Sequence, residues 1–245
     1  MNTIKLLLYR LLGLEKYLRI VSRIYIFLMD HNFGKKKYPE IHYLKTIVKP
    51  GFHCVDIGAN LGYFSYFLSK YAGANGKVFA VEPIPLFGEI WKRNVARTGF
   101  NNCQLLPYAL GAEEKTVEMG MPTVDGAIHH GMTKVIDNKQ QDSFEKTFEV
   151  SMKVPDELFS SLEKIDFLKI DIEGYEQYAF AHMKTVLEKH HPLIQAELGG
   201  EENRRICCDI LFSLGYTPKI LDGNTLVSIP ASDVNNYKQD LYFSA

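Results

Sequence analysis

The feature that constrains this chain most is a buried strand followed by a glycine-rich turn and the start of a helix. The apolar run 52–57 predicts the strand, and Gly58, Asn60 and Gly62 form the turn. Helix-like sequence continues over 61–71. Glycines permit positive φ angles and close approach of a ligand to the backbone. A helix N-terminus adds unpaired N–H groups and the positive end of a dipole, so this turn is predicted to bind a carboxylate or a phosphate.

The glycine spacing separates two kinds of cofactor. A dinucleotide fingerprint requires G-x-G-x-x-G, whereas Gly58 and Gly62 are four positions apart and Asp56 lies two before the first. The pattern D-x-G-x-N-x-G resembles motif I of the S-adenosylmethionine (SAM) methyltransferases. The next apolar run ends at Glu82, where an acid can bind both ribose hydroxyls of SAM or of NAD. The residues predicted to bind SAM here are Asp56, Gly58, Asn60, Gly62 and Glu82. A purely structural turn is the alternative.

Length and charge limit the classes of protein. A chain of 245 residues fits one α/β domain with an appendage. Its four cysteines include no C-x-x-C pair, which argues against zinc and disulfides and predicts a reduced, cytoplasmic setting. The net charge of −1 argues against nucleic-acid binding. Residues 1–37 contain eight Lys or Arg and two acids, so this segment carries +6 and the remainder −7.

The basic N-terminal segment has apolar residues at helical spacing over 3–29, with Gly13 as a predicted break. Its longest uncharged apolar stretch, 24–29, is far too short to span a bilayer. We favour a helix that packs on the catalytic domain, because most amphipathic helices cover a core. The second interpretation is a basic amphipathic helix that lies on the inner face of a membrane.

The remainder alternates between predicted strands and helices. Further strands are predicted over 77–81, 103–109, 115–119, 165–170 and 192–198, and helices over 38–48, 84–98, 154–162, 175–190 and 202–214. The turn at 222–224 predicts a C-terminal hairpin. Repeated alternation predicts a mostly parallel sheet with helices on both faces. Residues 120–150 are polar and irregular, so we expect a lid or a substrate-selecting insertion there.

Three blocks together resemble the FkbM family of SAM-dependent methyltransferases. They are 55–63, 109–111 and 167–176, the last containing Lys-Ile-Asp-Ile-Glu-Gly. The resemblance spans roughly residues 38–220. It implies a Rossmann-like class I methyltransferase with a mostly parallel seven-stranded sheet. The antiparallel C-terminal hairpin and the helical extension over 1–37 are predicted from the residues themselves, and 1–37 lies outside the shared motifs. The methyltransferase domain would be 38–245. The resemblance also implies SAM contacts at Ala109 and Asp171, and O-methylation of a small-molecule, glycan or glycolipid acceptor.

Three carboxylates are the candidates for the chemistry. Asp171 and Glu173 follow the predicted strand 165–170 and would point to the same side if that strand continues; Glu197 ends the next strand. One of them would act as general base, with a pKa raised by its neighbours. Alternatively, all three would hold Mg²⁺, or they would have only structural roles. His129 and His130 are weaker candidates for the base.

The sequence leaves two other classes of function open. A degenerate methyltransferase-fold protein would bind a membrane or a partner through its basic N-terminus. An NAD-dependent Rossmann enzyme would share the ribose-binding acid, although the glycine spacing speaks against it. Neither the identity of the acceptor nor the oligomeric state follows from these patterns.

Overall fold

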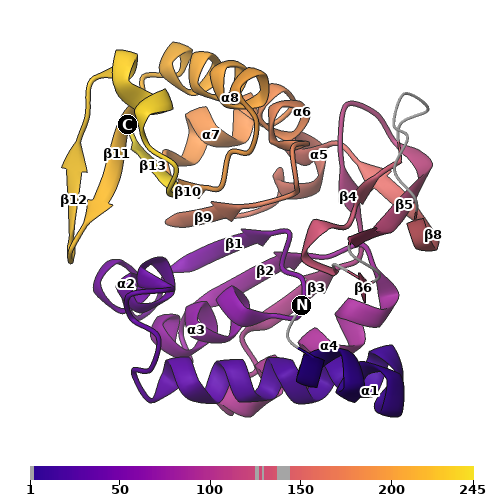
Figure 1. Cartoon of the computed structure of the whole chain (residues 1–245). Helices are drawn as coiled ribbons and strands as arrows, with labels where there is room; N and C mark the ends of the chain where they lie inside the picture. Colours follow the sequence, from indigo (N-terminus) through magenta and orange to yellow (C-terminus); the bar gives the residue numbers. More distant parts are fainter. Residues whose placement is uncertain (1–2, 125–126, 129, 137–143) are drawn as a thin grey trace.

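The computed structural model describes residues 3–124, 127–128, 130–136 and 144–245. Its main element is an eight-stranded sheet in the order β12-β11-β13-β10-β9-β1-β2-β3 (Figure 1). The strands are β1 His53–Ile57, β2 Lys77–Val81, β3 Cys103–Leu106, β9 Phe167–Ile170, β10 Leu193–Ala196, β11 Thr217–Asp222, β12 Thr225–Ser228 and β13 Leu241–Ser244.

The centre of this sheet is parallel, and one side of it is antiparallel. β3, β2, β1, β9 and β10 run in the same direction. β13 lies antiparallel between β10 and β11, and β11 forms the expected hairpin with β12. The predicted fold class is confirmed. The sheet has eight strands in the described part of the chain rather than seven, because the four-residue β13 carries no signal that separates it from a tail.

Helices cover both faces of the main sheet (Figure 1). One face carries α1 Thr3–Asp30, α2 Pro39–Ile47, α3 Tyr63–Ala72 and α4 Pro85–Val95, and the other α5 Pro155–Phe159, α6 Glu176–Ala181, α7 Lys184–His190 and α8 Glu201–Ser213. The helix predicted over 175–190 is two helices, because His182 and Met183 leave the helical path between α6 and α7.

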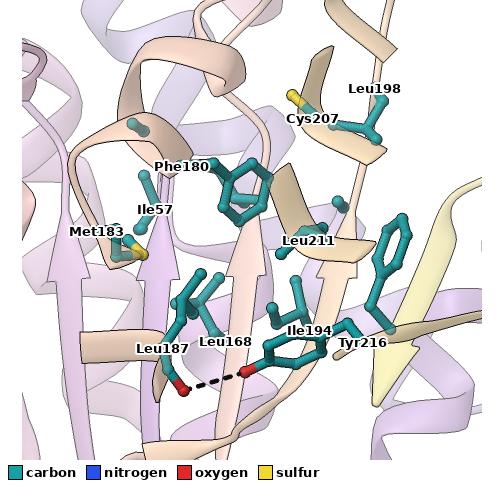
Figure 2. Close-up of a cluster of buried hydrophobic side chains, with 14 of the residues drawn as sticks. Ile57, Leu168, Phe180, Met183, Leu187, Ile194, Leu198, Cys207, Leu211 and Tyr216 are labelled. Atoms are coloured by element: carbon teal, nitrogen blue, oxygen red, sulfur yellow. Dashed lines mark hydrogen bonds between the residues drawn. The ribbon is translucent and has the colours of Figure 1, made fainter. Parts of the chain in front are cut away.

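Alternate side chains of the central strand enter different layers. Val55 and Ile57 join the cluster under α5–α8, while Cys54 joins the cluster under α2 and α3. Figure 2 shows part of the first cluster, where Ile57 and Leu168 of neighbouring strands lie close to side chains of α6, α7 and α8. The Tyr216 hydroxyl in this cluster donates to the Leu187 carbonyl at 3.4 Å. Burial on both faces explains why these strands read as continuous apolar runs.

A second, mostly antiparallel sheet stands beside the main one and corrects two predictions. Its order is β4-β8-β5-β6, with β7 paired to β5. The strands are β4 Ala109–Leu110, β5 Lys115–Val124, β6 Ala127–Ile128, β7 Lys134–Val135 and β8 Phe144–Lys153. The strand predicted over 103–109 is therefore divided, since the chain leaves β3 at Pro107 and Tyr108 and enters another sheet at β4. The segment 120–150 is not irregular where it is described, because β5 pairs with β8 from Lys115–Met152 to Pro122–Phe144.

The N-terminal helix α1 packs on the domain, as the favoured interpretation predicted. Gly13 has φ 73° and ψ 166°, so the expected break is confirmed. Leu14 and Leu18 are buried with Phe87 and Ile90 of α4, among others. Near its end, Ile26 enters the cluster under α2 and α3. Within the described residues, no helix is long and apolar enough to cross a membrane.

Candidate cofactor and acceptor site

The turn after β1 has the conformation that its glycines predict. Gly58, Asn60 and Gly62 all have positive φ, at 79°, 49° and 87°. A Cβ on Gly58 would lie 1.8 Å from the Asp171 carbonyl oxygen, and one on Gly62 would lie 2.9 Å from Trp91 Cδ1. Both positions therefore require glycine, for backbone conformation and for space. The first glycine also brings this turn against the end of β9.

Asn60 and the start of α3 present groups that a ligand can use. The Asn60 side-chain oxygen Oδ1 is buried and has no hydrogen-bond partner among the described residues. No side chain caps α3, whose N-terminus follows Gly62 directly. A helix N-terminus attracts a carboxylate. A buried acceptor without a partner is costly, so a ligand that donates a hydrogen bond to Asn60 would be stabilised here.

Glu82 follows β2 and is held by the same turn. Its Oε2 accepts a hydrogen bond from the Asn60 N–H at 2.8 Å, and its Oε1 accepts one from the Ile84 N–H at 2.8 Å. Each carboxylate oxygen retains a second lone pair that can accept a hydroxyl. Burial raises the pKa of Glu82 to about 7, although these two hydrogen bonds act to lower it. Glu82 is therefore pre-oriented to bind a pair of hydroxyls.

A cavity lies at the carboxyl ends of β1, β2 and β9, which is where open α/β sheets bind ligands. It encloses about 640 Å³, its open mouth included. Gly58, Asn60, Glu82, Asp171 and Glu173 line the side formed by the main sheet. The second sheet and the segments before β4 and around β7 supply the opposite wall, with Tyr108, Ala109, Leu110, Met119, Gly131, Thr133 and Val135. The described part of 120–150 thus contributes directly to the cavity.

Lys169 is the functional candidate that the sequence analysis missed. Its side chain is 4% exposed, and its Nζ lies 3.2 Å from Asp171 Oδ2 and 4.9 Å from the Phe64 ring centre. Burial lowers the pKa of Lys169, but the charges of Asp171 and Asp56 outweigh this, so the pKa lies above its ordinary value. The sequence did contain a sign of this role, because Lys169 lies within an apolar strand and lysine is almost never fully buried unless it is paired.

Glu173 lies in the turn after β9 rather than in the strand. The strand ends at Ile170, and Glu173 has φ 55°, which is uncommon outside glycine. The prediction that Asp171 and Glu173 point the same way along a continued strand is therefore wrong, although both line the cavity. Burial, followed by the charges of Asp171 and Glu176, raises the pKa of Glu173 to about 7.

Three predicted site residues are not in the cavity wall. Asp56 is fully buried and accepts a hydrogen bond from the Ser65 hydroxyl, so it supports the start of α3 from below. Gly62 contacts Trp91. Glu197 lies beyond the end of β10, one strand further from β1, in a separate hollow that includes Arg204. Burial and the charges of Asp171 and Asp240 still raise the pKa of Glu197 to about 7.

The predicted Mg²⁺ site at Asp171, Glu173 and Glu197 is not supported. Among the residues that the structure describes, no group of three or more His, Cys, Asp or Glu is arranged to hold a metal ion. The Lys169 ammonium lies beside Asp171, so the counter-charge that a cation would supply is already present. His129 lies outside the described residues, and so does the side chain of His130.

The residues present fit SAM. A buried acceptor without a partner at Asn60, an uncapped helix N-terminus at α3 and a positioned carboxylate at Glu82 match the amino, carboxylate and ribose groups of that cofactor. The fold and this site define a Rossmann-like methyltransferase of class I. The model of the methyltransferase FkbM domain matches residues 56–218. The chain therefore belongs to the FkbM methyltransferase family.

Individual proteins that are similar to this chain match it at low sequence identity or over a short segment. Methyltransferase sdnD of Sordaria araneosa is 26% identical over 167 residues, which are 58% of this chain and 62% of that protein. A protein-L-isoaspartate O-methyltransferase of Methanococcoides burtonii is 34% identical over 55 residues, 22% of this chain and 27% of that protein. The crystal structure of a methyltransferase FkbM from Methylobacillus flagellatus shows the same fold, with TM-score 0.50 and 15% identity over 83% of this chain and 50% of that one. The chain spans less than two thirds of each relative.

Proposed function

We propose that this chain is a SAM-dependent O-methyltransferase that modifies a hydroxyl on a sugar, glycan or glycolipid acceptor. One observation carries the proposal: Asn60 and Glu82, which fit SAM, and two carboxylates, Asp171 and Glu173, line the same cavity. When bound, SAM supplies the methyl carbon and the thioether leaving group. The protein's task is then to position the acceptor, exclude water and take up one proton.

The methionine carboxylate of SAM would meet the turn 58–62 and the start of α3. Its ribose hydroxyls would donate to Glu82, whose carboxylate the two backbone N–H groups already orient. The apolar Leu110 and Met119 in the opposite wall suit the flat face of an adenine. Gly58 and Asn60 of the turn line the cavity, and so do Glu82, Leu110 and Met119.

Glu173 is our candidate for the general base, and Asp171 for the group that orients the acceptor hydroxyl. A general base works best with a pKa near the working pH, and Glu173 has a pKa of about 7. Asp171 is paired with Lys169, which fixes its position. Glu173 would take up the hydroxyl proton as the acceptor oxygen becomes methylated. SAM, when bound, would supply the methyl group and retain the sulfur as a neutral thioether, so the charge balances.

The acceptor class is supported by the two carboxylates in the cavity wall, Asp171 and Glu173. Carboxylates accept hydrogen bonds from neighbouring hydroxyls, a pattern that suits a polyhydroxylated acceptor. Incubation with labelled SAM and cell-envelope glycan or lipid extracts, followed by mass spectrometry, tests this. Label only in protein or nucleic acid would contradict it.

Glu82→Gln is expected to weaken SAM binding by about 1.5–3 kcal/mol, the scale of hydrogen bonds to a charged group. Because the pKa of Glu82 is about 7, the parental affinity should fall as the pH drops below 7 and the carboxylate becomes protonated. The variant should lack this pH dependence. Calorimetric titration with SAM at several pH values measures both effects.

A parallel titration with NADH tests the dinucleotide alternative, and tight NADH binding without SAM binding would favour it.

Asp171→Asn is expected to slow turnover by about 10- to 100-fold, which corresponds to losing one hydrogen bond to a charged group. SAM affinity should change little, because Glu82 and Asn60 hold the cofactor in this proposal. Asp209→Asn, an exposed aspartate paired with Arg205, is the matched control. Single-turnover kinetics separates the chemical step from binding. An Asp171→Asn enzyme with the parental rate would remove Asp171 from the mechanism.

A further inference from the structure

A basic hollow lies between α1 and α4. Figure 1 shows these two helices in the helical layer on one side of the main sheet. It encloses about 1150 Å³, its open mouth included. Five cationic side chains line it: Lys16, Arg19, Arg23, Arg93 and Arg97. This hollow is separate from the cavity at the end of β1, and none of its residues has a role in the proposed function.

The cations of the hollow are largely without counter-charges. Arg19 lies 3.7 Å from Glu15, and both side chains are well exposed, so this pair adds little. Among the described residues, Lys16, Arg23, Arg93 and Arg97 form no salt bridge; the carboxylate near Arg93, Glu89, is already paired with Lys92. Concentrated charge of one sign in a concave surface attracts an anionic ligand.

Large apolar side chains lie exposed along the same helix. Ile20, Ile24 and Phe27 follow one another at helical spacing, and Ile24 and Phe27 are 50% and 51% exposed. Six of the ten exposed large apolar side chains in the described part of the chain fall within residues 11–33, so they are clustered rather than scattered. The packing of α1 on the domain does not explain why these side chains are apolar, because the buried Leu18 and Ile26 of the same helix make the contacts with the domain. Clustered exposed apolar side chains indicate an interaction surface.

Positive charge beside exposed apolar side chains fits a bilayer better than a nucleic acid. Phosphate groups satisfy the arginines in either case, but only the acyl boundary of a membrane takes up Ile20, Ile24 and Phe27. We propose that the α1–α4 face binds the surface of a membrane that contains anionic phospholipid. Lipid phosphates would occupy the hollow, with the apolar stripe at the headgroup boundary. This inference does not depend on methyltransferase activity.

The test is flotation of the full-length protein with vesicles of phosphatidylglycerol and phosphatidylcholine in roughly equal parts, at low salt and at ~0.5 M salt, where charge attraction is screened. We expect flotation with these vesicles at low salt, a strong reduction at high salt, and none with phosphatidylcholine alone. Inorganic phosphate at matched ionic strength should not compete more than chloride does. The proposal is overturned by no flotation with the anionic vesicles, by equal binding to both vesicle types, or by displacement with free phosphate.

Two sets of variants locate the surface. Lys16→Gln with Arg93→Gln should weaken vesicle binding by about 10-fold or more, since each cation near an anionic surface contributes roughly fivefold. Lys184→Gln with Arg205→Gln removes the same charge from α7 and α8 on the other face and should leave binding unchanged. An equal loss of vesicle binding in both double variants would show that the vesicles attract the protein's positive charge wherever it lies. That result would overturn the proposal.

Ile24→Ser with Phe27→Ser tests the apolar stripe, with thermal unfolding as the check that the variant is folded. Weaker flotation at an unchanged melting temperature supports the proposal; unchanged flotation contradicts the role of the stripe. Sedimentation of the parent protein adds a separate outcome. A dimer that this variant dissociates, together with no vesicle binding by the parent, would identify the face as a self-association surface instead.

Discussion

Glu173→Gln is expected to slow methyl transfer by about 10²–10⁴-fold, the range in which general bases contribute. Glutamine keeps the shape of the side chain but cannot take up the hydroxyl proton of the methylated substrate. In the parent, turnover should rise with pH through about 7, because Glu173 must be ionised to act and its pKa is raised to about 7. SAM affinity measured by calorimetry should be nearly unchanged in the variant, since Glu173 is not among the groups that fit the cofactor.

Glu197→Gln is the matched control for this prediction. Glu197 also has a pKa of about 7 and also follows a parallel strand, but it lies outside the cavity wall. Its substitution should change the rate by only a few fold, within the usual range for a neighbouring charge. A parental rate in Glu173→Gln together with a large loss in Glu197→Gln would reverse the assignment. The base would then lie in the hollow next to Arg204.

Gly58→Ala should prevent the formation of a stable native protein or lower its free energy of unfolding by about 4–5 kcal/mol. Losses of this size occur when a substitution severely disrupts core packing or backbone conformation. The added Cβ would lie 1.8 Å from the Asp171 carbonyl oxygen, at a φ of 79°. Neither group can move easily, because the Asp171 N–H also donates to the Ile57 carbonyl at 3.1 Å. Urea unfolding followed by circular dichroism measures the effect.

Gly99→Ala separates backbone strain from this collision. Gly99 also has positive φ, at 76°, but nothing lies within 4 Å of an added Cβ. Its substitution should cost only about 1–2 kcal/mol, the penalty of a left-handed conformation for a residue with a side chain. Equal losses at Gly58 and Gly99 would mean that the contact between the β1 turn and Asp171 is not tight.

Local patterns in the sequence were sufficient to predict the turn 58–62 and the acid beside it, which are the groups that fit SAM. The turn 58–62 and the acid at Glu82 each depend on a strand end and on the residues next to it. Because parallel strands end at a common edge, neighbouring strand ends come together whatever the rest of the fold does. The alternation of strands and helices predicted the sheet for the same reason, since periodicity and turn residues act over short distances.

Tertiary structure decided the parts that depend on contacts between distant segments. Register pairs Lys169 with Asp56 across neighbouring strands, and this placed a lysine charge in the core beside Asp171. The second sheet and the segments next to it bring 108–110 and 131–135 to the cavity, although among these residues only Ala109 was expected there, from the family resemblance. Glu197 matched Asp171 in its sequence context yet lies outside the wall, because β10 is one strand further from the turn. Strand order and sheet pairing set these distances, and they arise from the packing of the whole chain rather than from any stretch of it.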